Sequence, residues 1–216
     1  DAIDVFDICI SKVQNTDLKD RLENCKPSII TAVTDYLAKA PRIELHTIAT
    51  HNSINGNVTS EEMIKVYTDR MVGATSPGRY IYDKWRASAP NNICPLCAQR
   101  TTDTLEHHLP KGNFPIYSII PINIFPACSS CNKIKLDLIV NSPEREPIHP
   151  YFDDVDDELV FATVVDPLVG RLWGGAGLRR HGDWRELPVR TQVFAPVSDR
   201  WRVLDRAIHR DGGAVR

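Results

Sequence analysis

Two cysteine pairs constrain the fold of this chain more than any other feature of its sequence. Each pair has C-x-x-C spacing, and thirty residues separate Cys94 and Cys97 from Cys128 and Cys131. A two-residue gap lets both sulfurs reach one metal ion from a tight turn, and four sulfurs complete the tetrahedral set that zinc prefers. The alternatives are disulfides or four unrelated thiols, and disulfides are disfavoured because the first ten residues lack the pattern of a secretory signal. We therefore predict one structural zinc ion bound by all four cysteines.

The composition is that of a globular protein. Of the 216 residues, 42% are hydrophobic and 25% are charged, and no apolar run approaches the roughly 20 residues that a membrane-spanning helix needs. The formal net charge is -2, so bulk electrostatics does not attract nucleic acid, and such affinity must come from local patches or a partner. We expect a cytoplasmic protein with no membrane association.

Charge is distributed unevenly along the chain. Residues 143–170 carry 1 basic and 8 acidic side chains, whereas residues 171–216 carry 10 and 5. Such a shift marks a compositional boundary. Three parts are predicted: a helical region for support or partner docking at 1–90, a zinc-braced module at 91–142, and an acidic connector with an Arg-rich extension at 143–216.

Apolar residues recur at helical spacing in the first part of the chain. A first helix is predicted from the spacing of Ile3, Phe6, Ile10 and Val13. Thr16 can cap a second helix, which Pro27 bends or interrupts. The apolar stripe of that second helix continues through Ile29, Ile30, Val33 and Leu37.

A further helical segment begins at a capping box formed by Thr59 and Glu62, and Gly73 ends it. Its predicted inward face holds Ile64, Tyr67 and Met71. A short helix is predicted from Pro77 to about Ala87, started by Ser76. Stripes of this kind are more typical of core packing than of a cofactor site.

The C-terminal part gives weaker patterns. Residues 159–165 predict a buried strand. In residues 198–210 the apolar side chains again recur at helical spacing, around Trp201. On that helix a solvated face is favoured over a phosphate or acidic-partner site for Arg202, Arg206 and Arg210. The predicted class is α+β, with a helical N-terminal region, a central treble-clef-like ββα module pinned by zinc and a C-terminal α/β extension.

The segment between the cysteine pairs carries a second pattern. Glu106 and His107 are followed by two variable residues and Pro110, then by Asn123, and nine residues later by Asn132. Over residues 94–135 this pattern resembles the zinc-braced branch of the HNH nuclease family, which has the ββα-metal fold. The resemblance implies that the acidic residue and the histidine lie on a first strand. It places the first asparagine on the second strand or in the loop before the helix, and the second in the helix.

Hydrolysis of a phosphodiester needs a base to activate water and positive charge at the phosphoryl and leaving oxygens. His107 can act as the base, while Glu106 and Asn132 offer hard oxygen ligands to Mg²⁺ or Mn²⁺. Adjacent strand residues point to opposite faces, so Glu106 and His107 cannot both face inward on a regular strand. The resemblance assigns to Asn123 the loop that orients the histidine. Candidates for phosphate contacts are Lys111, Lys133 and Lys135.

Four further residues are assigned packing roles. His108 occupies a variable position of the motif and is predicted to point away from His107, at the surface or in packing. The segment from His149 covers or braces the metal site or forms a structural turn, and the turn is favoured. Cys9 and Cys25 lie on predicted helices and are expected to be inert buried thiols.

These residues together favour a metal-dependent endonuclease acting on nucleic acid, with DNA preferred. The resemblance implies 5′-phosphate and 3′-hydroxyl products. Size and motif placement resemble the HNH subunit of bacterial anti-phage systems of the Septu kind, which implies a partner ATPase and a role in defence. The alternative is a non-catalytic zinc module that binds nucleic acid or protein, because treble-clef zinc folds often only bind. Binding alone, however, does not need Glu106, His107, Asn123 and Asn132 together.

Overall fold

The computed structural model describes residues 1–153, 162–165 and 172–175. In chain order its helices are α1 (Ala2–Ile10), α2 (Thr16–Glu23), α3 (Lys26–Lys39), α4 (Ser60–Tyr67), α5 (Arg79–Arg86) and α6 (Ser129–Lys135). Its strands are β1 (Ser53–Ile54), β2 (Val58–Thr59), β3 (Thr104–His107), β4 (Ile124–Ala127), β5 (Ala162–Val165) and β6 (Leu172–Gly175). Consecutive strands pair as antiparallel two-stranded sheets. The described residues therefore confirm the predicted mixture of helices and strands.

The first two helices begin at side-chain caps. Asp1 accepts hydrogen bonds from the backbone of Ile3 and Asp4, which starts α1. The cap of α2 is Asn15, whose Oδ1 accepts from the Leu18 N–H at 2.9 Å, so the prediction that Thr16 caps this helix was wrong. An N-cap residue has an extended backbone, and Asn15 provides it while Thr16 is already helical.

The predicted interruption at Pro27 is confirmed. Helix α2 ends at Glu23, and α3 begins at Lys26 with Pro27 in its first turn, where its missing N–H has no helical partner to lose. The predicted stripe on α3 is only partly correct. Ile29 is buried, but Ile30 and Leu37 are 56% and 45% exposed. Tyr36 rather than Leu37 faces inward, because it lies seven residues after Ile29 on the same side of the helix.

The capping box at α4 is confirmed. Thr59 Oγ1 accepts from the Glu62 N–H at 3.2 Å, and the Glu62 carboxylate accepts from the Thr59 N–H at 2.9 Å. The same carboxylate receives two hydrogen bonds from the Arg21 guanidinium, at 2.7 and 2.9 Å, which joins α4 to α2. The helix continues as one π turn, Thr68–Val72, and ends at Gly73 as predicted.

Helix α5 lies within the range predicted for it, but it begins after Gly78 rather than at Ser76. On α4 and the turn after it, the buried side chains differ slightly from the predicted face. Tyr67 and Met71 are buried as expected, whereas Ile64 is only half-buried and Met63 is buried in its place.

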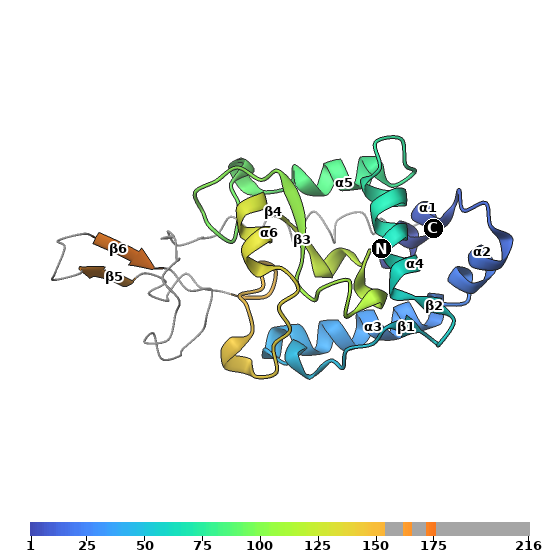
Figure 1. The fold of residues 1–216 in the computed structure, drawn as a ribbon, viewed down its shortest axis with the longest axis horizontal. Helices are drawn as coiled ribbons and strands as arrows, with labels where there is room; N and C mark the ends of the chain where they lie inside the picture. The colour runs from blue at the N-terminus through green and yellow to red at the C-terminus, as the bar shows by residue number, and fades with distance from the viewer. Residues whose placement is uncertain (154–161, 166–171, 176–216) are drawn as a thin grey trace, which may run out of the picture.

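One hydrophobic core joins the N-terminal helices to the β3–β4 hairpin. It extends from Val5 on α1 to Ile124 on β4. Helix α5 contacts both strands, and α3 packs against the turn Pro115–Tyr117 that lies between them in the sequence. In Figure 1, α5 and α3 lie on opposite sides of this hairpin. The helical region 1–90 therefore packs directly on the segment that carries the predicted motif.

The motif segment folds in the order strand, strand, helix. Strand β3 pairs with β4 so that Thr104 is opposite Ala127 and His107 is opposite Ile124. Helix α6 follows directly and contacts β3. This is the local order that the resemblance predicts, but Asn123 lies in the turn Pro121–Asn123 directly before β4, not on that strand or in the loop before α6.

Further along the chain, β5 falls inside the predicted strand at 159–165, and β6 lies where no strand was predicted. The predicted helix around Trp201, with Arg202, Arg206 and Arg210, lies outside the described residues. None of the described helices is both long enough and apolar enough to span a bilayer.

Gly78 allows α5 to approach α1 and the π turn closely. A Cβ added there would lie 2.8 Å from the Arg70 carbonyl oxygen and 3.0 Å from Cys9 Sγ. We expect Gly78→Ala to destabilise the protein by about 1–3 kcal/mol, because backbone must shift to relieve the overlap. Urea unfolding followed by circular dichroism measures this. The control is Gly112→Ala, which meets no atom within 4 Å, and equal stability losses in both variants would contradict the close approach.

Candidate functional site: a four-cysteine cluster and a cleft beside strand β3

The two cysteine pairs come together in one buried cluster. Their sulfur atoms all lie within 4.8 Å of one another. Zinc–sulfur bonds of 2.3 Å place tetrahedral sulfurs about 3.8 Å apart, and Cys97 Sγ lies 3.7 Å from Cys128 Sγ. Among the described residues no other group of three or more His, Cys, Asp or Glu side chains is arranged to hold a metal. The donor set and its spacing fit a structural zinc ion.

Backbone turns position these sulfurs. In the first pair, the Arg100 N–H donates to Cys97 Sγ at 3.4 Å. In the second, Cys128 is the N-cap of α6, and its Sγ accepts from the Cys131 N–H at 3.5 Å. A hydrogen bond between Cys131 and Cys94 lowers the pKa of the Cys94 thiol and raises the pKa of the Cys131 thiol, so the two sulfurs share one proton when no metal is bound. The cluster packs in a small second core with Phe125 and other apolar side chains.

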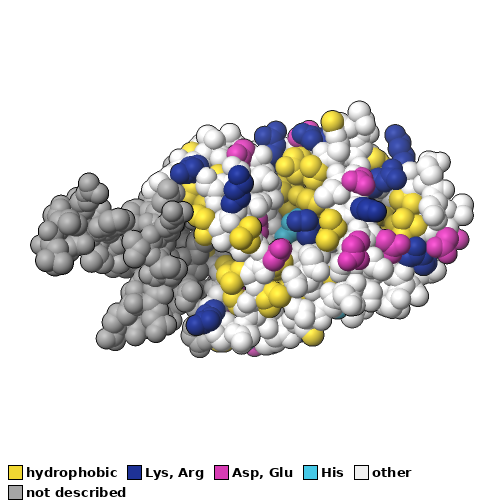
Figure 2. Space-filling view, in the orientation of Figure 1, with side chains coloured by type: hydrophobic (Ala, Val, Ile, Leu, Met, Phe, Trp, Pro, Cys, Tyr) yellow, Lys and Arg dark blue, Asp and Glu magenta, His cyan; other side chains and the backbone are white. Residues whose placement is uncertain are grey.

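A cleft of about 390 Å³ lies beside β3. Four predicted site residues from three segments line it: Glu106, His107, Lys111 and Asn132. Figure 2 shows a hollow near the middle of the molecular face, where a histidine and a basic side chain meet hydrophobic side chains. Glu106 and His107 line the same cleft although they are adjacent in sequence, and His107 is the last residue of β3. On a regular strand these two side chains would point to opposite faces, but here both reach the same cleft.

His107 is held by a backbone carbonyl and an aromatic ring. Its Nε2 lies 2.8 Å from the Ser118 carbonyl oxygen, which can only accept, so Nε2 carries the proton and Nδ1 has the free lone pair. The Tyr67 ring packs edge-on against the imidazole, with the ring centres 4.6 Å apart. Burial and the nearby Lys111 charge lower the pKa of His107 to about 3. The imidazole is therefore neutral at neutral pH, with an unprotonated Nδ1, although the lowered pKa makes that nitrogen a weaker base than in a free histidine.

Asn123 is fully buried beneath the cleft and uses both ends of its amide. Its Oδ1 accepts from the Leu109 N–H at 2.8 Å, and its Nδ2 donates to the carbonyls of Leu109 and Tyr117 at 3.0 and 3.1 Å. Tyr117 directly precedes Ser118, whose carbonyl holds His107. Through these hydrogen bonds Asn123 connects Leu109, two residues after His107, to Tyr117, which precedes the carbonyl that orients the imidazole.

Glu106 and Lys135 form a buried ion pair. Lys135 Nζ lies 3.0 Å from Glu106 Oε1 and donates to the His107 carbonyl oxygen at 2.6 Å. Burial raises the pKa of Glu106, and the charges of Lys135 and Lys111 oppose that rise. Burial lowers the pKa of Lys135, and Glu106 opposes that fall. Lys135 was predicted to contact phosphate, but here its ammonium neutralises the carboxylate instead.

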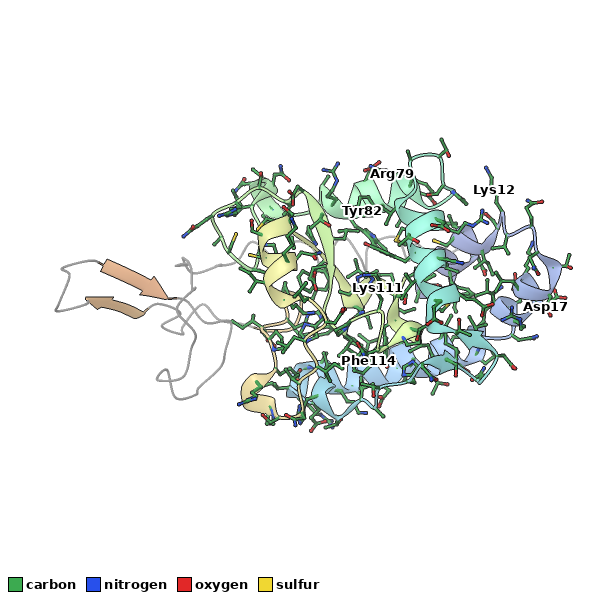
Figure 3. The ribbon with its side chains drawn as sticks, viewed as in Figure 1. Lys12, Asp17, Arg79, Tyr82, Lys111 and Phe114 are labelled. Carbon is green, nitrogen blue, oxygen red and sulfur yellow. The ribbon has the colours of Figure 1, made fainter. Side chains whose placement is uncertain are left out.

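The remaining predicted residues differ in exposure. Asn132 is half-buried and donates from Nδ2 to the Leu105 carbonyl at 3.0 Å, so its Oδ1 is the atom left for a ligand. Lys111 Nζ lies 5.7 Å from the centre of the Tyr67 ring, at the cleft. In Figure 3, Lys111 lies between Tyr82 and Phe114 near the middle of the view. Lys133 is exposed and does not line the cleft.

His108 and His149 pack against each other, with ring centres 4.4 Å apart, and both are buried. His149 also opens a turn in which its N–H donates to Asp153 Oδ2 at 2.7 Å, which confirms the predicted turn. Its Nε2 lies 2.8 Å from the Tyr36 hydroxyl, and that hydroxyl donates to Asn123 Oδ1 at 3.3 Å. The segment after α6 is therefore linked through α3 to the amide beneath the cleft.

Three contributors to the cleft were missed by sequence reasoning. Tyr67 was assigned to the core, but it also lines the cleft and contacts His107. Asp137 presents an exposed carboxylate at the cleft, and its sequence position after α6 gave no signal. The Ser118 carbonyl is a backbone group, so no residue type could have marked it.

The chain is similar in sequence to a phage protein. Protein Ea31 of Escherichia phage lambda is 30% identical over 132 residues, which cover 59% of this chain and 44% of that protein. The chain therefore spans less than half the length of the relative. No family model matches the chain, and no solved structure matches it. The relative's name states no activity, so function must be argued from the cleft.

Removal of one cluster cysteine is expected to abolish zinc binding. Wild-type protein should contain about one zinc per chain, the number that one four-thiolate site holds. Cys94→Ser should lose that zinc and melt at a lower temperature, because metal binding contributes folding free energy. Elemental analysis and thermal melting measure both effects. Cys25→Ala is the control, since Cys25 lies outside the cluster, and zinc retained by Cys94→Ser would contradict the site.

Asn123→Ala is expected to destabilise the fold by about 3 kcal/mol or more. It leaves the Leu109 N–H and the Leu109 carbonyl without a partner in the interior, and each such group costs about 1–3 kcal/mol, while the Tyr117 carbonyl keeps a hydrogen bond from the Ile120 N–H at 3.3 Å. Asn132→Ala removes one hydrogen bond at a half-buried site and should cost about 1 kcal/mol. Urea titrations compare the two variants. Similar losses would show that the Asn123 network is not a principal support.

Proposed function

We propose that this protein is a metal-dependent endonuclease that hydrolyses phosphodiester bonds of nucleic acid, with DNA as the favoured substrate. The observation that carries the proposal is the convergence of Glu106, His107, Lys111 and Asn132 on one cleft. They supply a neutral imidazole, a carboxylate, an amide oxygen and a cation. Metal-assisted hydrolysis of a phosphodiester needs these groups together, and a zinc module that only binds does not.

Each side chain has a definite task in the proposed reaction. His107 accepts the proton of the attacking water at Nδ1, while the Ser118 carbonyl fixes the ring through Nε2. Glu106 and Asn132 Oδ1 would hold Mg²⁺ or Mn²⁺, which when bound supplies positive charge to the phosphoryl and leaving oxygens. Lys111 contributes charge for the substrate phosphate at the same cleft.

The chemistry of the donor set fits a hard cation. Two oxygen-bearing side chains leave several coordination positions to water and to substrate phosphate, as is common for Mg²⁺. Glu106 already interacts with one positive charge, the Lys135 ammonium 3.0 Å from its Oε1, which supports the proposal that this carboxylate attracts cations. The products expected from the resemblance are 5′-phosphate and 3′-hydroxyl ends.

A partner ATPase and a role in anti-phage defence remain part of the proposal. The partner is supported by the near-neutral charge of the chain, because such a chain has little electrostatic affinity for nucleic acid by itself. Cleavage should therefore be assayed both with the isolated protein and with extract of the native host.

His107→Ala is expected to reduce Mg²⁺- or Mn²⁺-dependent cleavage by about 10²–10⁴-fold, the usual contribution of a general base. A panel of single- and double-stranded DNA and RNA serves as substrate, and product ends are mapped. Zinc content should be kept, because His107 lies outside the cysteine cluster, and circular dichroism checks that the variant is folded.

The control is His51→Ala, whose imidazole does not line the cleft. It should cleave as wild type does. Equal cleavage by His107→Ala and wild type would overturn the assignment. Tight binding to nucleic acid that survives in EDTA, with zinc retained and no product, would favour the non-catalytic zinc module.

A further inference from the structure

The buried pair formed by Lys135 and Glu106 occupies the place where the proposed reaction needs a divalent cation. Lys135 is 8% exposed and Glu106 is 5% exposed, and their charged atoms lie 3.0 Å apart. The ammonium also donates to the His107 carbonyl at 2.6 Å. Glu106 and Asn132 would hold the metal, and the carboxylate of Glu106 is thus already neutralised by the Lys135 ammonium.

A divalent cation arriving at Glu106 would meet two further positive charges. Lys135 contacts the carboxylate, and Lys111 lies close enough to affect the pKa of both Glu106 and Lys135. Asp137 is the other carboxylate at the cleft, and it is exposed. Like charges in a partly buried site repel strongly, so the cation binds poorly unless negative charge enters with it. Substrate phosphates carry that negative charge.

We propose that Lys135 competes with the divalent cation for Glu106, so that the cation and the phosphate backbone of the substrate bind together rather than independently. Without substrate, the ammonium holds the carboxylate. When the cation and a phosphodiester enter the cleft, the ammonium leaves Glu106 Oε1, keeps the His107 carbonyl and turns toward the phosphate. The inference rests on the proposed function, since it assigns the metal to Glu106.

Position on α6 makes this exchange feasible. Lys135 is the last residue of the helix, and Leu136 after it lines the cleft. Leu136 has φ +47° and ψ -140°, a backbone conformation that side-chain-bearing residues rarely adopt. The long side chain of Lys135 can move its charge by rotation about its own bonds while the helix stays in place. The exchange therefore needs no rearrangement of the fold.

The test measures Mn²⁺ affinity of the zinc-loaded full chain by electron paramagnetic resonance of free Mn²⁺. Lys135→Met removes the competing charge and should bind Mn²⁺ at least tenfold more tightly than wild type. Lys133→Met, on the same helix but exposed, should stay within twofold. Lys135→Arg keeps the charge and should bind no more tightly than wild type. Glu106→Gln combined with Lys135→Met should lose the gain.

A second measurement uses only wild-type protein. A phosphorothioate oligonucleotide that resists cleavage should raise the Mn²⁺ affinity of the protein at least tenfold, after correction for the Mn²⁺ that the oligonucleotide binds alone, because its charge replaces Glu106 as the partner of Lys135. Melting temperature and zinc content confirm that each variant is folded. Unchanged affinity in folded Lys135→Met, with Mn²⁺ binding still lost in Glu106→Gln, would overturn the exchange and leave the metal site standing. If replacing Glu106 by Gln changed the Mn²⁺ affinity in none of the variants, the metal site would be overturned as well.

Discussion

The buried amide of Asn123 is the interaction on which the geometry of the cleft depends. It is bonded to Leu109 on one side and to Tyr117 on the other, and the loop between them is closed through these contacts. The carbonyl that orients His107 belongs to Ser118, which directly follows that loop. Because the amide is fully buried, no water can replace a lost partner, and the loop keeps one conformation. The direction of the imidazole is thus set by a residue that never reaches the cleft.

Support for this amide comes from parts of the chain that are far apart in sequence. Tyr36 on α3 donates to Asn123 and contacts His149 in the turn after α6. Glu146 in the same segment accepts from the backbone N–H of His46 at 3.0 Å and lies 2.9 Å from its ring. The N-terminal helices therefore do more than cover the hairpin. Together with the turn that carries His46, they hold the segment from Glu146 to His149 in place through these polar contacts.

Sequence reasoning found what depends on residue type and local spacing. The cysteine cluster, the capping box at Thr59 and the break before Pro27 each follow from rules that act within a few residues. It failed where tertiary packing decides. Whether Leu37 or Tyr36 faces inward depends on what covers α3, and the ion pair of Lys135 with Glu106 forms only because α6 packs against β3. The Ser118 carbonyl could not be found from sequence, since every residue has one.

The two sites are mechanically connected through α6. This helix has 7 residues, too few to be stable alone in water, because isolated helices shorter than about 12 residues are marginal. Its first turn is held by Cys128 and Cys131 of the cysteine cluster, and its last turn carries Asn132 and Lys135. A bound zinc ion therefore fixes the end of the helix opposite to the one that serves the cleft. Loss of zinc would release both the amide oxygen and the ammonium from their positions beside Glu106. A zinc ion bound by the four cysteines would thus hold the charged groups beside Glu106 in place without contacting them.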